Sequence, residues 1–466
     1  MTHEPKTSPK AVLLSVSLGQ FMVPMMFTSV GVALPSMGRE LGASAPQLAL
    51  VEQLYALSLA ISILTFGRLG DVTGRRRVYV WGLTVFTLMT ASLGFAHSIE
   101  SLIVQRFVQG LGAAMLLSGS MALVSDVFPA GVRGRMIGIV SAVTYAGLTL
   151  GPLLGGTITS RLGWRYVFWL VVPLGITAWL VCLISMRGEP SPSSKEPMDW
   201  RGSLVYAAGV AAFMLGAAHA GEGLISTVMM VAGLAGLCLF VILEKRTTDP
   251  LLDIGLMTQN RFFSLSCLAA MGMYASAFGV TFFMSLYLQY ARGLSPREAG
   301  FVLLIQPLLQ FVVSPIAGRL SDRRSPAALA NAGMILCTLG LISCAFSVAP
   351  DAPLITAAFE LALVGLGTGL FVTPNVVAIM GSVEPRRYGV ASGMIGTMRT
   401  LGLVLSMTTA TLVFSLVMGG AAVNQQTLPG FLTSMRACLI VFSFFACCGL
   451  LFSFGRGKTA RPETAR

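Results

Sequence analysis

Long uncharged apolar segments recur along this chain and limit its possible folds more than any other feature. The segments 11–38 and 136–160 contain no charged residue. A bilayer core about 30 Å thick needs about 20 apolar residues per helix. Only 11% of the chain is charged, about half the fraction found in soluble domains. Because the alternating pattern of a membrane β-barrel is absent from the sequence, we expect an all-α membrane protein.

Fourteen apolar windows are long enough to span a membrane, and short loops connect them. Most Lys and Arg residues fall in alternate loops and in the two tails, which by the positive-inside rule places both termini in the cytoplasm. The formal net charge of +12 is therefore a signal of topology, and nucleic-acid binding is not expected. We predict a monomeric, multi-pass protein of the cell (inner or plasma) membrane that contacts the lipid bilayer.

A glycine-rich polar loop between two predicted spans occurs twice. The sequence GRLGDVTGRRR at 67–77 returns in shortened form as GRLSDRR at 318–324, and GLG at 110–112 returns at 365–367. Parallel repeats of this kind occur in one large class of secondary transporters. We predict two six-helix halves, 1–187 and 262–466, separated by an inserted helix pair in 188–261.

Seven short motifs follow one another in an order typical of a known transporter family. They are the 67–77 loop, RFVQGLGAA at 106–114, GLTLGPLLGG at 147–156, GWRYVF at 163–168, DWRG at 199–202, YLQY at 287–290 and ASGMIGTMRTLG at 391–402. With these motifs the chain resembles the major facilitator superfamily, and within it the fourteen-span drug:proton antiporters of the EmrB/QacA type. The resemblance covers nearly the whole chain and implies a major facilitator fold with 14 transmembrane helices.

The resemblance gives two of these motifs a mechanical role. The polar loops would latch the two halves together on the cytoplasmic side through a gating motif of Gly67, Gly70, Asp71, Gly74, Arg75, Arg76, Gly318, Asp322 and Arg323. The antiporter motif, which in the family marks exporters, consists of Gly147, Gly151, Pro152, Gly155 and Gly156. Small residues at four-residue spacing permit close helix approach, and proline marks a bend. A solvated turn and ordinary helix packing are the respective alternatives.

Four charged residues fall within predicted spans and are candidates for proton coupling: Glu52, Arg106, Glu360 and Arg399. Each costs roughly 2.5 to 3.5 kcal/mol at a helix centre, so a functional role is the first hypothesis. Glu52 and Glu360 are the candidate proton carriers, although both lie close enough to the outer interface to reach water. For Arg106 the resemblance implies a cavity-facing role in coupling, with interhelical hydrogen bonding as the alternative.

The first span departs from the family pattern. Met26 stands where the family carries an acidic residue, which leaves open the site of proton binding and any preference for cations. The candidate substrate-cavity residues are Met25, Met26, Tyr145, Phe278, Phe282, Gln306 and Asn375. Flexible methionines suit the binding of varied apolar compounds, and amides in hydrocarbon need partners. Packing against lipid or neighbouring helices is the alternative for each.

The expected function is secondary active export of small molecules, with protons exchanged for amphipathic drugs or toxic metabolites. An exporter or flippase of neutral or anionic compounds, including lipids, is the alternative, because the first span lacks its acid while two arginines lie within spans. An ATP-driven pump is disfavoured, since no GxxxxGK[ST] motif occurs. We expect no enzymatic activity, no metal and no cofactor, with the proton gradient as the source of energy.

Overall fold

The computed structural model describes residues 8–457, except for short gaps at 129, 187–197, 220–222, 248–250, 253, 322, 351, 384–387 and 420. The described elements are helices, which confirms the all-α expectation. Those of the first part of the chain are α1 (Pro9–Leu41), α2 (Ala45–Thr73), α3 (Arg75–Leu93), α4 (Ile99–Val127), α5 (Ala130–Arg161), α6 (Arg165–Ser185), α7 (Trp200–Ala218) and α8 (Leu224–Glu244). They are followed by α9 (Ile254–Gln259), α10 (Arg261–Leu286), the π-helical turn η1 (Tyr287–Ala291), α11 (Pro296–Leu303), α12 (Ile305–Ser321), α13 (Pro326–Ser347), α14 (Leu354–Met380), α15 (Tyr388–Met418) and α16 (Leu428–Gly455).

Twelve helical segments of the described chain are long and apolar enough to cross a membrane, not the fourteen expected from the sequence. In this count α10 with η1, and α11 with α12, each form one segment. The helices outside the count are α3, of 19 residues, α5, of 32 residues, and the six-residue α9. The helix α3 begins with three arginines, which lower the mean hydropathy of its first turn.

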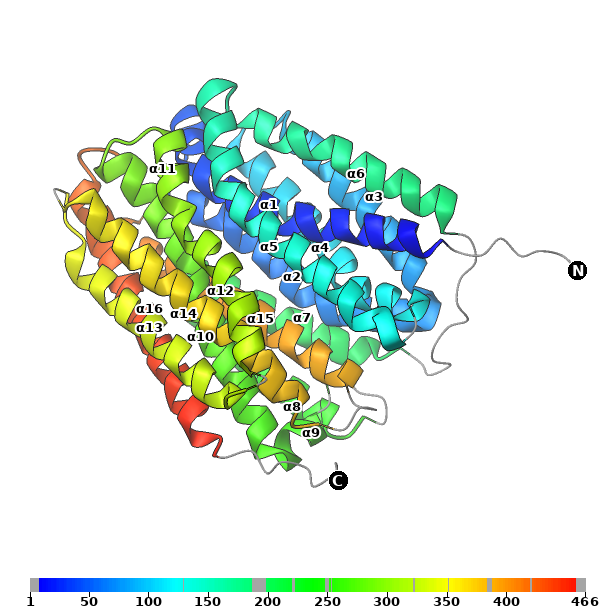
Figure 1. Cartoon of the computed structure of the whole chain (residues 1–466). Coiled ribbons are helices and arrows are strands. Elements are labelled where there is room, and N and C mark those ends of the chain that lie inside the picture. Colours follow the sequence, from blue (N-terminus) through cyan, green and yellow to red (C-terminus); the bar gives the residue numbers. More distant parts are fainter. Residues whose placement is uncertain are drawn as a thin grey trace, which may run out of the picture.

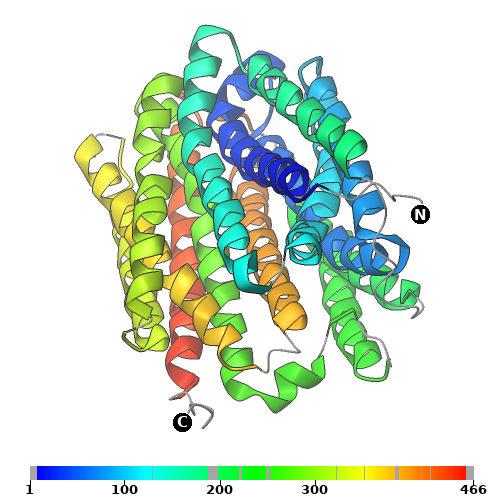
Figure 2. The same cartoon turned by 45° about the vertical axis from the view of Figure 1, so that its right-hand side comes forward.

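Two groups of helices lie side by side. In the first group α1 packs against α4, α5 and α6, and α2 packs against α3 and α4. In the second group α10 packs against α15 and α16, α13 against α14 and α16, and α12 against α14. The groups meet where α1 contacts α10, α5 contacts α11 and α12, and α2 contacts α15. Figures 1 and 2 show the blue and cyan helices of the first group beside the green-to-red helices of the second.

The helix pair α7–α8 lies against the seam between α2 and α15. Glycines bring the pair together: a Cβ atom on Gly233 would lie 2.4 Å from the backbone nitrogen of Phe213, so only glycine fits there. Tyr206 and Met214 of α7 share a small hydrophobic cluster with Leu57 of α2 and Val404 of α15. The pair therefore contacts both helix groups.

Hydrogen bonds between the groups gather at the end of the bundle where α1, α5 and η1 finish, which we call the closed end. Ser285 donates to the carbonyl of Gly31 over 2.7 Å, and the Gln289 amide donates to the carbonyl of Val32 over 2.9 Å. Pro35 has no N–H, so the carbonyl of Gly31 lacks its usual helix partner and is available to Ser285. The π-helical turn carries Gln289, and its extra residue changes the direction in which the last side chains of the helix point.

A second contact at the closed end joins three helices. The Gln53 side chain of α2 accepts a hydrogen bond from Thr411 of α15 over 2.5 Å and donates to the carbonyl of Met214 in α7 over 3.2 Å. Gln53 is fully buried. One turn nearer the surface, the same three helices line a cavity of about 440 Å³ that includes Leu50 and Ala218. Gln53 therefore connects both groups and the inserted pair below this cavity.

Candidate functional site

A buried ion pair lies at the centre of the first group. Arg106 of α4 donates from Nη2 to Oε2 of Glu52 in α2 over 3.3 Å, and the two residues are 0% and 2% exposed. Arg106 Nη1 donates to Gln109 over 2.7 Å, and Gln109 donates in turn to Thr90 of α3 over 2.7 Å. The guanidinium also lies 4.1 Å from the centre of the Tyr55 ring. These contacts compensate the buried charge, which would otherwise be strongly destabilising.

The ion pair leaves one acceptor unused. Oε1 of Glu52 is buried and has no hydrogen-bond partner among the described residues. Orphaned buried oxygens are rare because each loses its hydration without compensation. Glu52 is therefore a carboxyl group with room to bind a proton, held next to a fixed positive charge.

A row of aromatic rings crosses from the first group to the second. The ring centre of Tyr55 lies 6.3 Å from that of Phe27 of α1. The Phe27 ring packs edge to face against Phe278 of α10, with the ring centres 5.9 Å apart. Phe278 then stacks on Tyr274 at 5.7 Å with an interplanar angle of 22°. We call Tyr55, Phe27, Phe278 and Tyr274 the aromatic row. Tyr55 is buried, whereas the other three are only half-buried.

Arg399 of α15 lies at the far end of the aromatic row. The Arg399 guanidinium interacts electrostatically with Tyr274 of α10 and with Tyr145 of α5. It therefore lies near helices of both groups. The side chain is half-buried, and within the described chain it has no hydrogen-bond or ion-pair partner. An unpaired cation inside a membrane costs roughly 2.5 to 3.5 kcal/mol. Of the four charged residues predicted within spans, the structure brings Glu52 and Arg106 into contact and shows no partner for Arg399 among the described residues.

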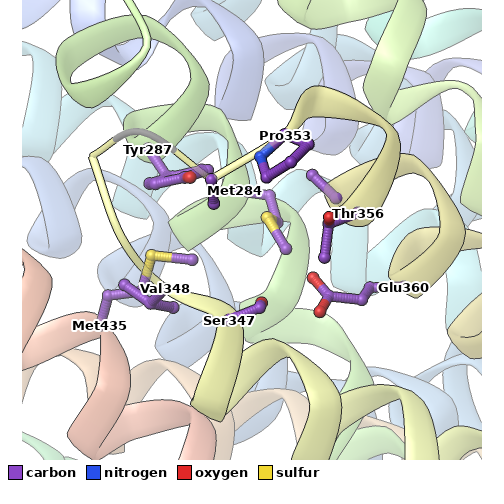
Figure 3. Close-up of a pocket in the computed structure, with 10 residues that line it drawn as sticks. Met284, Tyr287, Ser347, Val348, Pro353, Thr356, Glu360 and Met435 are labelled. Carbon is purple, nitrogen blue, oxygen red and sulfur yellow. The ribbon is translucent and has the colours of Figure 1, made fainter.

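Glu360 of α14 lies elsewhere, in the second group. It is 1% exposed and accepts a hydrogen bond from Ser343 of α13 over 2.9 Å. Figure 3 shows its carboxyl group directed toward Met284 and Ser347 across a small cavity. The cavity has a volume of about 10 Å³, close to the minimum for one water molecule. Glu360 is thus a buried carboxyl group separate from the Glu52–Arg106 pair.

The antiporter motif holds α5 against two different partners. Cβ atoms on Gly147, Gly151 and Gly155 would each lie within 3.0 Å of backbone atoms of α1, so these glycines pack α5 within the first group. A Cβ atom on Gly156 would lie 2.3 Å from the carbonyl oxygen of Pro296 in α11, in the second group. Pro152 leaves the carbonyl of Leu148 without its helix donor, and Thr28 of α1 approaches it at 3.5 Å.

The gating motif at 67–77 forms an ion-pair cluster that the sequence reveals only in part. Arg75 at the start of α3 contacts Asp71 of α2 over 2.7 Å and Asp126 of α4 over 2.8 Å. Asp126 was not predicted, because nothing local in the sequence relates it to the loop. Gly74, with φ of 113°, makes the turn between α2 and α3. Of the shortened copy, Gly318 lies in α12 and Arg323 lies two residues beyond its end, while Asp322 lies outside the described residues.

The predicted substrate-cavity residues fall into two sets. Tyr145 and Phe278 are half-buried and lie near Arg399 or in the aromatic row. The others are nearly covered by neighbouring helices: Met25, Met26, Phe282, Gln306 and Asn375. Asn375 donates to the carbonyl of Ser266 and accepts from Arg456, so it has partners within the second group. The sequence did not single out Phe27 or Tyr274, although both are aromatic residues within apolar segments.

Comparison with known proteins identifies the family. A family model described as Major Facilitator Superfamily matches residues 16–407. The chain belongs to the major facilitator superfamily. This is a superfamily of transporters, so the chain is a membrane transporter and not an enzyme.

Individual members of the superfamily resemble the chain over most of its length. Riboflavin transporter RibZ of Clostridioides difficile is 29% identical over 400 residues, covering 84% of this chain and 86% of that protein. Multidrug resistance protein Stp of Mycobacterium tuberculosis is 31% identical over 395 residues, covering 84% and 73%. A crystal structure of a bacterial homolog to the human lysosomal transporter Spinster, inward-facing and unoccupied, superposes with a TM-score of 0.64 at 18% identity over 96% of each chain. The structural similarity establishes the major facilitator fold.

Proposed function

We propose that this transporter is a proton-coupled exporter of amphipathic compounds that works by alternating access in the cell membrane. The observation that carries the proposal is the buried Glu52–Arg106 pair with its unused carboxyl oxygen. Ionised Glu52 neutralises Arg106. Protonation of Glu52 removes that compensation and leaves a buried cation, which favours a rearrangement of the site.

The neighbour of Glu52 in sequence supplies a route from protonation to movement. Gln53 holds the contact between α2 and α15 at the closed end. A change in the Glu52–Arg106 pair is therefore transmitted through the backbone of adjacent residues of α2 to a contact between the two helix groups. Relatives named for multidrug resistance support export of amphipathic compounds as the direction and cargo.

The closed end is proposed to face the outside of the cell, because the positive-inside rule favours cytoplasmic termini and cytoplasmic 67–77 and 318–324 loops. The described conformation would then be closed to the exterior. In the opposite conformation the closed-end bonds separate, and the 67–77 loop and its copy latch the halves on the cytoplasmic side.

The finer organisation is proposed to follow the sequence prediction. With α3 and α5 added to the twelve apolar segments the chain has fourteen spans, as in the EmrB/QacA type. The halves are residues 1–187 and 262–466, and α7 and α8 belong to the insert at 188–261. The protein acts as a monomer and needs only protons and a small-molecule substrate, without a cofactor.

Transport in reconstituted vesicles tests the coupling. An imposed pH gradient should drive uptake of a fluorescent amphipathic dye, and a proton uncoupler should abolish it. Glu52→Gln should lose the pH-driven component while retaining downhill exchange, and Glu360→Gln added to it should remove any remainder. Glu100→Gln, on an exposed residue at the start of α4, serves as the matched control. Full coupling in the double variant would refute Glu52 and Glu360 as proton carriers.

A further inference from the structure

The cations inside the described helix bundle differ in what surrounds them. Arg106 is paired with Glu52 and covered by Tyr55. Arg456, just after α16, is enclosed by neutral acceptors, including Asn375 at 2.7 Å and Asn331 at 3.0 Å. Arg399 has neither kind of partner within the described chain, although its side chain is half-buried among tyrosines. It therefore has unused hydrogen-bond donors and an uncompensated charge.

The aromatic residues next to Arg399 also have unused surface. Several phenylalanines of the second group, such as Phe283 and Phe414, are fully buried. Tyr274, Phe278 and Tyr145 are only half-buried. The rings of Tyr274 and Phe278 are within 22° of parallel, and both side chains are partly exposed near the Arg399 guanidinium.

The balance of charge at this surface favours a negatively charged ligand. Glu52 lies near the Tyr55 end of the aromatic row, because it pairs with the Arg106 that covers the Tyr55 ring, and Arg106 compensates its charge. Met26, on the neighbouring helix α1, contributes no charge. The region between Arg106 and Arg399 therefore carries a net positive charge, which attracts an anion and repels a cation.

We propose that the substrate is an amphipathic anion whose planar aromatic body stacks on Tyr274 and Phe278 while its carboxylate, sulfonate or phenolate group pairs with Arg399. This inference rests on the proposed transport function and names its substrate class. The planar guanidinium can donate two parallel hydrogen bonds to the two oxygens of a carboxylate or sulfonate, which a lysine cannot do. The site lies between α5, α10 and α15, so the ligand contacts both helix groups.

Equilibrium binding to the purified full-length protein in lipid nanodiscs tests the proposal without a proton gradient. Three planar fluorescent probes serve as ligands: fluorescein as the anion, Nile red as the neutral compound and ethidium as the cation. The wild-type protein should bind fluorescein more tightly than ethidium. Ethidium bound more tightly than fluorescein would overturn the proposal without recourse to any variant.

Variants at one position then separate an anchoring role from a structural one. Arg399→Gln should weaken fluorescein binding roughly 10- to 100-fold and leave Nile red binding unchanged. Arg399→Lys should weaken fluorescein binding by a smaller factor than Arg399→Gln. Arg201→Gln makes the same charge change on an exposed residue of α7. It should alter neither fluorescein binding nor Nile red binding. Unchanged fluorescein binding in Arg399→Gln, or equal losses for all three probes, would overturn the proposal. Loss of pH-driven transport with intact fluorescein preference would instead refute proton coupling alone.

Discussion

Gly156 offers a direct test of whether the contact between α5 and α11 holds the closed end together. In Gly156→Ala, the new Cβ atom would lie 2.3 Å from the carbonyl oxygen of Pro296 and 3.3 Å from the Cα atom of Arg297. Both neighbours are backbone atoms, so they cannot move aside as a flexible side chain would. Overpacking of this kind costs about 1–3 kcal/mol.

The cost applies only to the conformation in which α5 and α11 touch. Alanine raises helix stability over glycine by about 0.5–1 kcal/mol, but it does so in both conformations, so this contribution cancels. The ratio of separated to closed conformations should therefore rise roughly 5- to 150-fold.

Electron spin–spin distances measure this ratio. Spin labels at Arg161 and Arg297 would report on the outer ends of α5 and α11, since both side chains are exposed. Gly156→Ala should transfer population from the short to the long distance. Gly155→Ala is the matched control, because its Cβ atom would clash with Ser29 at 2.8 Å inside the first group. An unchanged distance distribution in Gly156→Ala, or an equal change in Gly155→Ala, would refute the reasoning.

Three further contacts can be tested by substitution. Glu52→Leu should lower the free energy of unfolding by about 3–5 kcal/mol, because it leaves the buried Arg106 without its counter-charge, and adding Arg106→Met should restore most of that loss. Thermal unfolding in detergent measures the stability of both variants. Losses of stability that simply add in the double variant would contradict the pairing. Gln53→Leu should increase hydrogen exchange in α7 and α15 together, whereas Thr411→Val should affect only α15; identical exchange in the two variants would show that Gln53 does not hold α7. Arg75→Ala should loosen the contacts of α3 with α2 and α4 by about 0.5–2 kcal/mol, and an unfolding midpoint equal to that of the wild type would show that the Asp71–Arg75–Asp126 cluster contributes nothing to stability.

The helices themselves were largely predictable from sequence, because membrane spans are defined by composition over about 20 residues. The uncharged apolar segment 11–38, for example, lies within α1 at Pro9–Leu41. Local geometry was less predictable: the π-helical turn at Tyr287–Ala291 and the break between α11 and α12 leave the apolar composition unchanged. The same criterion gives twelve spans in the described chain and not fourteen; α3 is outside the count because arginines at its start dilute its apolar window.

The candidate site was predictable as a list of residues but not as an arrangement. Glu52 and Arg106 were each selected as charges inside spans, yet their pairing depends on how α2 and α4 rotate about their axes. Four-residue spacing predicted a common face for Gly147, Gly151 and Gly155, as observed. Gly156 lies about 100° further around the helix, and only the tertiary structure reveals that this direction leads to α11.

The bond between Ser285 and the carbonyl of Gly31 has a consequence for the role of water. Pro35 removes the helix donor for this carbonyl, so Ser285 satisfies an oxygen that would otherwise have no partner. When α10 moves away from α1, a water molecule has to take the place of the serine hydroxyl. Opening of the closed end is therefore a hydration step, and osmolytes that lower water activity should slow transport even when the proton gradient and the substrate concentration are held constant.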